Sequence, residues 1–371
     1  MPATRNPSVT QLSPAPMPAP LLAPLLNWYA GHARTLPWRA PPGGGLRPDP
    51  WHVLLSEVML QQTTVAAVTP RYHCFLARYP TVQALAAAPL DDVLGQWAGL
   101  GYYARARNLH ACARAIADLG YFPDKEAALL LLPGVGDYTA AAIAAFAFHE
   151  PTVPLDANLL RVGARLFGVA LPPSQARAPV RAALAGLVPP HAPGDFAQAL
   201  MDLGAAICTV RTPRCLACPI AFACKAHAAG TPEAFPAPAP RKARPVRLGS
   251  AWWIESGGDI ALVRRPPRGL LGGMLALPGT GWAVGDAEPV PPPIGAPSNA
   301  APLLLEHVFT HFTLRLSLTA SRSASRAAHI ADQPIIWTPR AELAGAGLPS
   351  LYRRAADLLL ACRPQDCFEA A

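Results

Sequence analysis

Residues 131–156 read LLPGVGDYTAAAIAAFAFHEPTVPLD and combine a glycine turn, an alanine-rich segment and a carboxylate. Gly134 and Gly136 allow a tight turn and let the backbone approach a ligand closely. The run from Thr139 to Phe148 has strong helix propensity, and the free N–H groups where such a helix begins form a site for one phosphate. Asp156 follows a Pro-Thr-Val-Pro break. The residues alone fit either a phosphate-binding turn or an ordinary helix–helix turn with an N-cap aspartate.

The chain has 371 residues and is 51% hydrophobic, which is enough for two or three domains with large cores. No apolar run reaches membrane-spanning length, so we expect no membrane partner. The first twenty residues hold one arginine and no apolar segment, which argues against a secretory or mitochondrial address. We predict that residues 1–20 form a disordered tail.

The net charge of +8 is unevenly distributed. Residues 21–228 carry 16 basic and 12 acidic side chains, residues 229–247 carry 4 and 1, and residues 248–371 carry 10 of each. The excess on the first part and the following segment suits a polyanionic partner, although many basic proteins bind no nucleic acid.

Four of the eight cysteines fall in one short run, and the other four are scattered. Cys208, Cys215, Cys218 and Cys224 follow the spacing C-x6-C-x2-C-x5-C. Such a group in a chain without a signal peptide indicates metal binding rather than disulfides. Four thiolates suit either a zinc ion or an iron–sulfur cluster.

A second informative segment begins at Asp49-Pro50, an acidic N-cap followed by a proline at the first helical position. It predicts a helix over Trp51–Ala67 with one broad apolar face. Glu57 lies beside that face. An isolated helical glutamate is usually a solvated charge, and the residue pattern alone favours that interpretation.

The string S-E-V-M-L-Q-Q-T around Glu57 resembles the signature of the MutY-type adenine DNA glycosylases. The L-P-G-V-G turn resembles the helix-hairpin-helix motif of the superfamily that also contains endonuclease III. The resemblance implies that Glu57 is the catalytic acid, that Asp156 lies at the active site, and that the turn with Gly134 and Gly136 binds DNA. It further implies positioning roles for Tyr138 and Asn158, and base contacts for Gln61 and Gln62.

Residues 97–109 resemble the G-L-G-Y-Y-x-R-A-R-N-L block of the same family. A glycine turn with paired tyrosines and basic residues suits the insertion of an aromatic wedge into a duplex. The alternative is a turn with core aromatics and solvated arginines. With the resemblance, Tyr102 is our candidate wedge and Arg105 a candidate DNA ligand.

The cysteine spacing matches the 4Fe-4S loop of the endonuclease III and MutY families, which implies one such cluster. After it, residues 229–247 are expected to form a basic Pro-rich linker. Apolar runs at 252–254 and 260–263, with Gly257-Gly258-Asp259 between them, predict a strand hairpin.

Residues 264–274 resemble, more weakly, a segment of the Nudix-like C-terminal domain of MutY, and the glutamate run of nucleotide pyrophosphatases is missing. The resemblance assigns Phe309, Thr310 and His311 to the loop that reads the damaged guanine opposite the target adenine. Thr310 replaces the family's serine and keeps the hydroxyl.

These observations predict a mainly α N-terminal part, residues 21–228, with two helical subdomains and the 4Fe-4S loop at 208–224, and an α+β Nudix-like domain at 248–371. The resemblance implies a monofunctional adenine glycosylase for A:8-oxoguanine or A:G mispairs in double-stranded DNA. We expect a cytoplasmic, nucleoid-associated bacterial monomer. Two alternatives stay open: an endonuclease III-like glycosylase/lyase, and a non-catalytic iron–sulfur DNA-binding protein.

Overall fold

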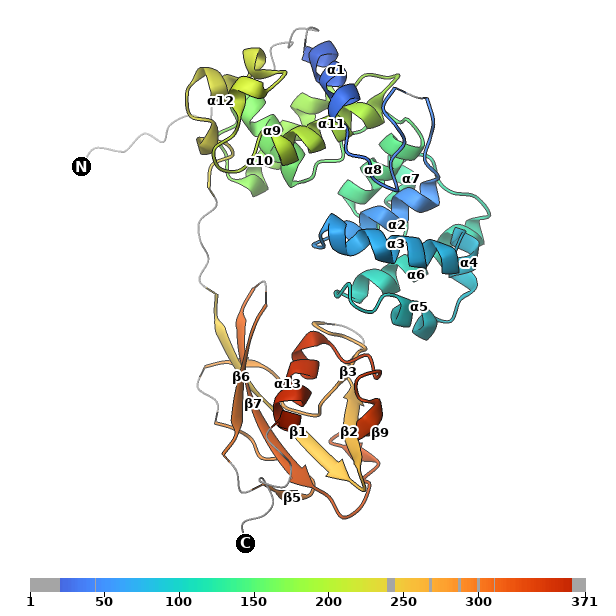
Figure 1. Cartoon of the computed structure of the whole chain (residues 1–371), viewed down its shortest axis with the longest axis vertical. Coiled ribbons are helices and arrows are strands. Elements are labelled where there is room, and N and C mark those ends of the chain that lie inside the picture. Colours follow the sequence, from blue (N-terminus) through green and yellow to red (C-terminus); the bar gives the residue numbers. More distant parts are fainter. Residues whose placement is uncertain are drawn as a thin grey trace, which may run out of the picture. The chain divides into compact units, whose positions relative to one another are not determined.

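The computed structural model describes residues 21–43, 45–238, 244–266, 269–285, 288–298, 301–309 and 311–361. The chain divides into two compact units (Figure 1). The described parts of residues 1–90 and 107–240 form the first unit, and those of 91–106 and 241–371 form the second. No helix of the described residues is long and apolar enough to span a membrane.

The first unit is helical, as the sequence predicts, and its helices form two groups (Figure 1). One group contains α2 (Pro50–Leu60), α3 (Val65–Arg78), α4 (Val82–Ala87), α6 (Ala104–Leu119), α7 (Glu126–Leu129) and α8 (Asp137–Ala147). The other contains α1 (Leu22–His32), α9 (Ala157–Phe167), α10 (Pro173–Ala185), α11 (Pro193–Ala206) and α12 (Lys225–Ala228). Helix α8 packs against α2 and α7 on one side and against α11 on the other, so it joins the groups.

Short polar side chains cap several of these helices, which explains where they begin. The Asp49 carboxylate accepts a hydrogen bond from the Trp51 amide at 2.7 Å, with Pro50 at the first helical position. Thr81 caps α4 in the same way. The Asp156 carboxylate caps α9, which ends at Gly168 in the left-handed conformation.

Two predicted helices are shorter than expected. The helix expected over Trp51–Ala67 ends at Leu60, and α3 begins at Val65 with Thr64 as its N-cap. Gln62 adopts φ of +58° between them, which interrupts the helical hydrogen bonding. The sequence also favours a helix from Leu21 to Trp38 with a turn at residues 36–39, whereas α1 ends at His32.

Helix α8 is the buried centre of the first unit, because every residue from Thr139 to Ala147 is buried. Its small alanine side chains allow close packing by α2 and α11. The turn before it requires glycine at one position. Gly134 has φ of +73°, and a Cβ atom there would lie 2.5 Å from Cβ of Asn108. Gly136 has φ of −99°, and nothing lies within 4 Å of an added Cβ.

Part of the expected linker is ordered against the first unit. The Phe235 carbonyl accepts a hydrogen bond from Arg165, and the Ala237 amide donates to Leu171. Arg241 and Lys242, which contribute to its predicted charge, lie outside the described residues.

The second unit contains a mixed sheet with the order β5-β7-β1-β2-β9-β8, to which β3 is added by pairing with β2, β4 by pairing with β1, and β6 by pairing with β7. Its strands are β1 (Val246–Ser256), β2 (Asp259–Arg264), β3 (Leu275–Ala276), β4 (Ala283–Val284), β5 (Ala296–Pro297), β6 (Leu303–Val308), β7 (Thr313–Arg322), β8 (His329–Ile330) and β9 (Gln333–Pro339). Only β1 and β7 pair in parallel among the described strands. The predicted hairpin is confirmed, with Gly257 and Gly258 as its turn at positive φ.

Alternation along β1 places its two tryptophans in different cores. Trp253 packs with the leucines of β6 and β7 beneath α13 (Ser350–Ala361), whereas Trp252 packs with Ala261 and Ile330 on the opposite face of the sheet. The expected α+β class of this domain is thereby confirmed. Helix α5 (Leu90–Gln96) and the following turn group with this unit rather than with the first.

We expect Gly134→Ala to destabilise the protein by about 3 kcal/mol, because the change combines a strained left-handed residue with a steric overlap at Asn108. Gly136→Ala is the matched control, and we expect it to cost less than about 1 kcal/mol. Unfolding in urea, followed by circular dichroism, measures both variants. Equal stabilities of the two would contradict the role given to Gly134.

Candidate active site

A cavity of about 820 Å³ opens where the two helix groups of the first unit meet. Its walls come from α2, α8, α11, the beginning of α9 and the segment after α1. Six of the predicted site residues line it: Glu57, Gln61, Gln62, Tyr138, Asp156 and Asn158. Packing therefore brings together residues that lie up to 101 positions apart in the sequence.

The Glu57 side chain is buried, with 8% of the residue exposed. The pKa of its carboxyl is raised from 4.5 to about 7, mainly by burial, and the charge of Asp156 acts in the same direction. A hydrogen bond from Tyr138 and the charge of Arg39 both act in the opposite direction. A carboxyl group with this pKa is largely protonated just below neutral pH, so it can donate a proton.

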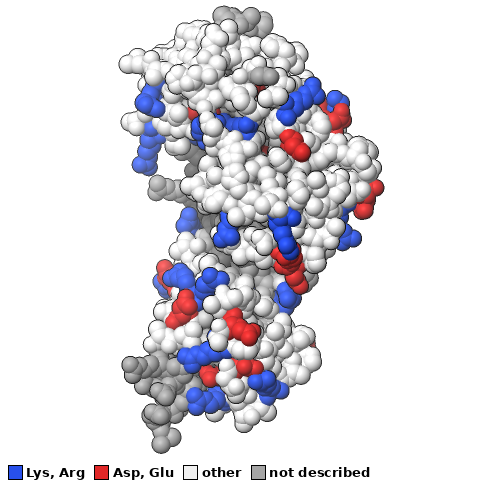
Figure 2. Space-filling view, turned by 45° about the vertical axis from the view of Figure 1, so that its right-hand side comes forward, with Lys and Arg blue, Asp and Glu red and all other residues white. Residues whose placement is uncertain are grey.

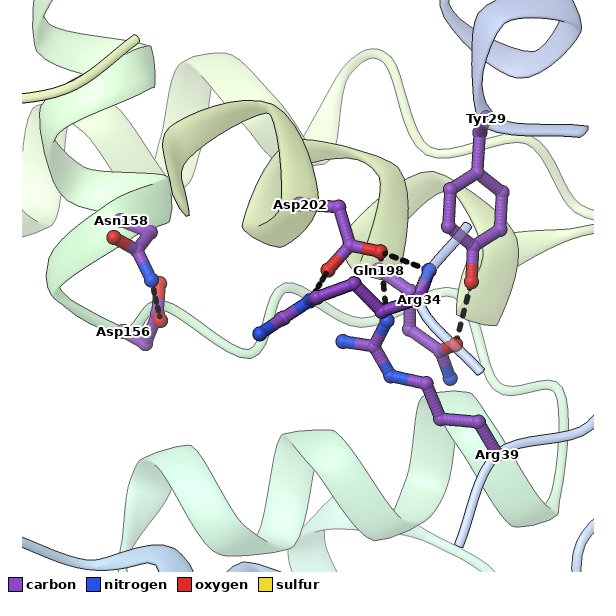
Figure 3. Close-up of polar contacts among 7 residues, drawn as sticks. All are labelled: Tyr29, Arg34, Arg39, Asp156, Asn158, Gln198 and Asp202. Atoms are coloured by element: carbon purple, nitrogen blue, oxygen red, sulfur yellow. Dashed lines mark hydrogen bonds and ion pairs between the residues drawn. The ribbon is translucent and has the colours of Figure 1, made fainter. Parts of the chain in front are cut away.

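Asp156 also faces the cavity, but its carboxylate is held by more hydrogen bonds. Its Oδ1 accepts from the Leu159 amide at 2.6 Å, and its Oδ2 accepts from Asn158 Nδ2 at 3.1 Å (Figure 3). Burial raises the pKa of Asp156, while these bonds and the charge of Arg161 lower it. Two carboxyl groups in such different surroundings can take separate roles, one as a proton donor and the other as a fixed negative charge.

Asn158 is fixed by contacts behind it. Its Oδ1 accepts a hydrogen bond from Arg161 at 2.9 Å, and Arg161 also donates to the carbonyls of Gly204 and Cys208, both at 2.8 Å. Gly204 must be small, because an added Cβ would lie 2.8 Å from Cβ of Asn158. The hydrogen bonds therefore run continuously from Asp156 to the backbone of the first cysteine in the cysteine run.

Tyr138 is the second residue of α8, directly after the glycine turn. Its hydroxyl forms a hydrogen bond with Glu57. Burial raises the pKa of Tyr138 well above 10, and the charges of Glu57 and Asp156 raise it further. The phenol therefore stays protonated and acts as a hydrogen-bond donor to Glu57.

The interruption between α2 and α3 explains the position of the two glutamines. Gln61 follows the last residue of α2, and Gln62 takes the left-handed conformation. The helix does not continue through these residues, and both of them line the cavity at the turn between α2 and α3. Their contact with DNA bases remains a prediction.

Sequence reasoning missed a polar network on one wall of the cavity (Figure 3). The Asp202 carboxylate, 1% exposed, accepts hydrogen bonds from Arg34 Nε at 2.6 Å and from Arg39 at 2.8 Å. Nearby, the Tyr29 hydroxyl donates to Gln198 Oε1 at 2.7 Å. A detectable signal existed, because Gln198 and Asp202 are polar residues four positions apart within the apolar sequence FAQALMDLG.

The turn before α6 shows an exposed aromatic ring and a buried cation. Tyr102 is 54% exposed with φ of +48°, as a wedge residue would need. Arg105 is 8% exposed and donates to the carbonyls of Leu100 and Gly101 at 3.0 and 3.3 Å, with its guanidinium over the rings of Trp97 and Tyr102. Arg105 thus braces the turn, and these bonds do not favour its predicted contact with DNA.

The four predicted cysteine ligands line one small cavity, together with Arg165. Within the described residues, no three His, Cys, Asp or Glu side chains are close enough to hold a single metal ion. Arg165 donates a hydrogen bond to Cys208 Sγ at 3.2 Å. A set of four cysteines around one cavity suits either a zinc ion or an iron–sulfur cluster.

The predicted reader loop lies at the β6–β7 hairpin of the second unit. The Phe309 amide donates to the Phe312 carbonyl at 2.9 Å, and the Phe309 ring stacks on Trp282 at 5.6 Å. His311 is exposed. Thr310 lies outside the described residues. The hairpin thus presents His311 to solvent, while its contact with a damaged base remains a prediction.

On the face drawn in Figure 2, Lys and Arg side chains lie scattered among Asp and Glu side chains. The charge excess counted in the sequence is therefore not concentrated in one patch on that face. The prediction of a polyanionic partner rests on the motifs more than on the charge.

Comparisons with known proteins place this geometry in context. Residues 55–190 match the HhH-GPD superfamily of base excision DNA repair proteins, and residues 250–358 match a NUDIX domain. An adenine DNA glycosylase of Mycolicibacterium smegmatis is 42% identical over 212 residues, which cover 56% of this chain and 70% of that protein. A human adenine DNA glycosylase is 36% identical over 312 residues, which cover 70% of this chain and 57% of that protein.

Among solved structures, a thermostable thymine-DNA glycosylase matches with a TM-score of 0.50 and 29% identity. The match covers 56% of this chain and 95% of that chain, so it concerns the first unit's fold. The match spans 57% of the length of two relatives, the human protein and that of Buchnera aphidicola.

We expect Glu57→Gln to stabilise the protein progressively as the pH rises from 4.5 to about 7. The folded pKa of Glu57 exceeds its ordinary value, so the stability that its proton contributes below pH 4.5 is lost as the pH rises through 7. The variant does not titrate there, and linkage gives a difference of about 3 kcal/mol above pH 7.

Thermal unfolding of both proteins between pH 4 and pH 8 measures this difference. Glu342→Gln, at an exposed position, is the control and should show no comparable trend. A Glu57→Gln difference that does not change with pH would contradict the burial argument.

Proposed function

Because the chain belongs to the adenine DNA glycosylase family, we propose that it hydrolyses the N-glycosidic bond of adenine in duplex DNA, at mispairs with 8-oxoguanine or guanine. The membership confirms the resemblance inferred from the motifs. One observation supports the proposed activity most directly: Glu57 and Asp156 line the same cavity, and the pKa of Glu57 is raised to about 7, so that about half of this carboxyl keeps its proton at neutral pH.

The reaction begins with a base that leaves the DNA stack. A glycosylase cannot reach the bond inside a duplex, so the target nucleotide must rotate into the cavity. A volume of about 820 Å³ is ample for a nucleoside. Tyr138 then holds the Glu57 carboxyl in position. The proton of Glu57 moves to the adenine ring, at N7 as the family resemblance implies. Protonation is needed because the adenine anion is a poor leaving group.

Departure of the base leaves positive charge on the sugar. Asp156, ionised and oriented by Asn158 and the Leu159 amide, stabilises this oxocarbenium-like sugar, as the second carboxylate of a glycosidase does. Water then adds to C1′ while its proton passes to the Glu57 carboxylate, which completes the hydrolysis and restores the acid. Arg177 donates to the Leu155 carbonyl at 3.0 Å, beside Asp156 at the cavity wall, and helps to keep this segment in place.

Tyr138 also argues for a monofunctional enzyme. In the lyase branch of the superfamily, the resemblance places a lysine two residues after the second glycine of the hairpin, where its amine attacks C1′. A phenol cannot form a Schiff base. The product is then an intact strand with an abasic site, which disfavours the endonuclease III-like alternative.

Contact with the DNA backbone is assigned to the glycine turn before α8. Gly136 has open space at its Cα, and the amides at the start of α8 are available to one phosphate. Tyr102 is the proposed wedge, since it is exposed beside the turn that Arg105 braces. Gln61 and Gln62 contact bases beside the flipped nucleotide.

We assign Cys208, Cys215, Cys218 and Cys224 as ligands of one 4Fe-4S cluster. When bound, such a cluster cross-links the loop and gives it structural stability. Arg165, 2% exposed, donates a hydrogen bond to Cys208 Sγ and so holds the first cysteine of the set in place. Arg161 joins the same loop to Asn158 of the active site.

The second unit is proposed to read the base opposite adenine through Phe309, Thr310 and His311. We further propose that the protein acts as a monomer in the bacterial cytoplasm, at the nucleoid where its substrate lies. The non-catalytic alternative needs neither a buried Glu57 nor an aligned Asp156, so an excision assay separates it from the glycosylase.

We expect Glu57→Gln to excise adenine about 10²–10⁴-fold more slowly while keeping its affinity for the duplex, because only the acid is removed. Single-turnover excision from an A:8-oxoguanine duplex measures the rate, with products resolved before and after alkali. Strand breaks should appear only after alkali. A variant with more than a tenth of the wild-type rate would show that Glu57 is not the acid.

We expect His311→Ala to lower the preference for A:8-oxoguanine over A:G by about tenfold, the effect of one lost hydrogen bond. His329→Ala is the matched control, because His329 is exposed on β8 of the same unit. Excision rates on both duplexes give the ratio for each protein. An unchanged ratio in His311→Ala would reject the reader assignment.

A further inference from the structure

Asp202 is a buried carboxylate at the centre of the polar network on α11. Only 1% of the residue is exposed, and both of its oxygens accept hydrogen bonds. Oδ1 accepts from Arg34 Nε at 2.6 Å, while Oδ2 accepts from the Arg34 amide at 3.1 Å and from Arg39 Nη1 at 2.8 Å. One carboxylate thus binds two arginines that lie 163 and 168 positions earlier in the chain.

Arg39 forms an ion pair with Asp202 and lines the same cavity as Glu57. Its side chain is 9% exposed, and it lines the cavity with Glu57 closely enough that its charge lowers the pKa of Glu57. A nearly buried guanidinium needs an anionic partner, because an uncompensated charge is costly inside a protein. Asp202 supplies that partner, so Glu57 does not have to ionise to neutralise the charge of Arg39.

We propose that Asp202 is a positioning residue for the glycosylase reaction: by binding Arg39 and Arg34 it keeps Arg39 from pairing with Glu57, which therefore stays a protonated acid. This inference rests on the proposed function and refines it. The side chain of Arg34 is 42% exposed, unlike that of Arg39. Water can therefore solvate the charge of Arg34 when Asp202 is replaced.

The other groups around the two carboxyls do not replace Asp202. Glu57 on α2 faces Tyr138 of α8, Asp156 at the start of α9 and Arg39 of the segment after α1. Asp202 faces Arg34, Arg39 and the phenol of Tyr29 on α1. Burial raises the pKa of Tyr29 to about 12, so it stays neutral. The charge of Asp195, at the start of the same helix, also acts on Tyr29, but the carboxylate that forms the ion pair with Arg39 is that of Asp202, at 2.8 Å.

The test is the pH profile of single-turnover adenine excision at saturating enzyme. Activity should fall as the pH rises through the pKa of Glu57, which defines the basic limb. In Asp202→Asn, Arg39 turns to Glu57 and favours its ionised form, so we expect the limb about one pH unit lower. The rate at pH 8 then falls about tenfold, while the rate near pH 5.5 is almost unchanged.

Two further variants separate this mechanism from simple loss of packing. Arg39→Gln removes the cation, so its limb should move to higher pH. Asp202→Asn/Arg39→Gln removes both buried charges and should show the limb of Arg39→Gln alone, because Asp202 acts through Arg39. If Asp202→Asn by itself fails to fold, the inference is still tested by comparing the double variant with Arg39→Gln.

Asp195→Asn is the matched control on the same helix. Asp195 accepts a hydrogen bond from the Gly43 amide outside the catalytic cavity, so its profile should equal that of the wild type. A limb that stays at the wild-type pH in Asp202→Asn, or a double variant whose limb lies below that of Arg39→Gln, would overturn the inference.

Failure of the proposed function looks different, because the wild type would then excise no adenine at any pH. In that case the pKa of Glu57 is read from the pH dependence of thermal stability, by comparing each protein with its Glu57→Gln counterpart. The same shifts are expected there, and an unchanged pKa in Asp202→Asn and in the double variant would again overturn the role of Asp202.

Discussion

The burial of one carboxyl group, that of Glu57, is the constraint on which the first unit depends. A carboxylic acid of ordinary pKa cannot donate a proton at neutral pH, and only a site with little water raises that pKa to about 7. Helix α2 must therefore pack closely on α8, which the alanine side chains of α8 allow. The glycine turn before α8 then places Tyr138 against the same carboxyl. The acid and its hydrogen-bond donor thus come from two packed helices.

The wall of the cavity that contains Asp156 has a different chemistry, because its side chains stabilise ionised groups instead of keeping a carboxyl group neutral. Asp156 caps α9 and receives hydrogen bonds that favour its ionised form, and Asn158 is fixed in turn by Arg161 and the close approach of Gly204. Asp202 performs a comparable task for the two arginines. The cavity therefore contains an acid, Glu57, an anion, Asp156, and a neutralised cation, Arg39. The charge state of each depends on neighbours from other parts of the chain.

Local patterns in the sequence predicted local structure well. The Asp49-Pro50 helix start, the Gly134 turn and the Gly257-Gly258 hairpin depend on residues that are adjacent in the chain, and all three are confirmed. The break at Gln62 was missed because no glycine or proline marks it. Residue patterns alone suggested a solvated Glu57, since its burial depends on α8, 80 residues later. The pairing of Arg39 with Asp202 was missed for the same reason: neither residue by itself indicates a partner 163 positions away.

The central claim, that packing keeps Glu57 protonated near neutral pH, has a direct spectroscopic test. In protein labelled with ¹³C at the glutamate side-chain carboxyls, the Glu57 signal is identified by its loss in Glu57→Gln and followed from pH 4 to pH 9. Titration with a midpoint near 7 is the expected result. A midpoint near 4.5, the ordinary value, would show that the carboxyl is ionised at neutral pH and would contradict its role as the acid.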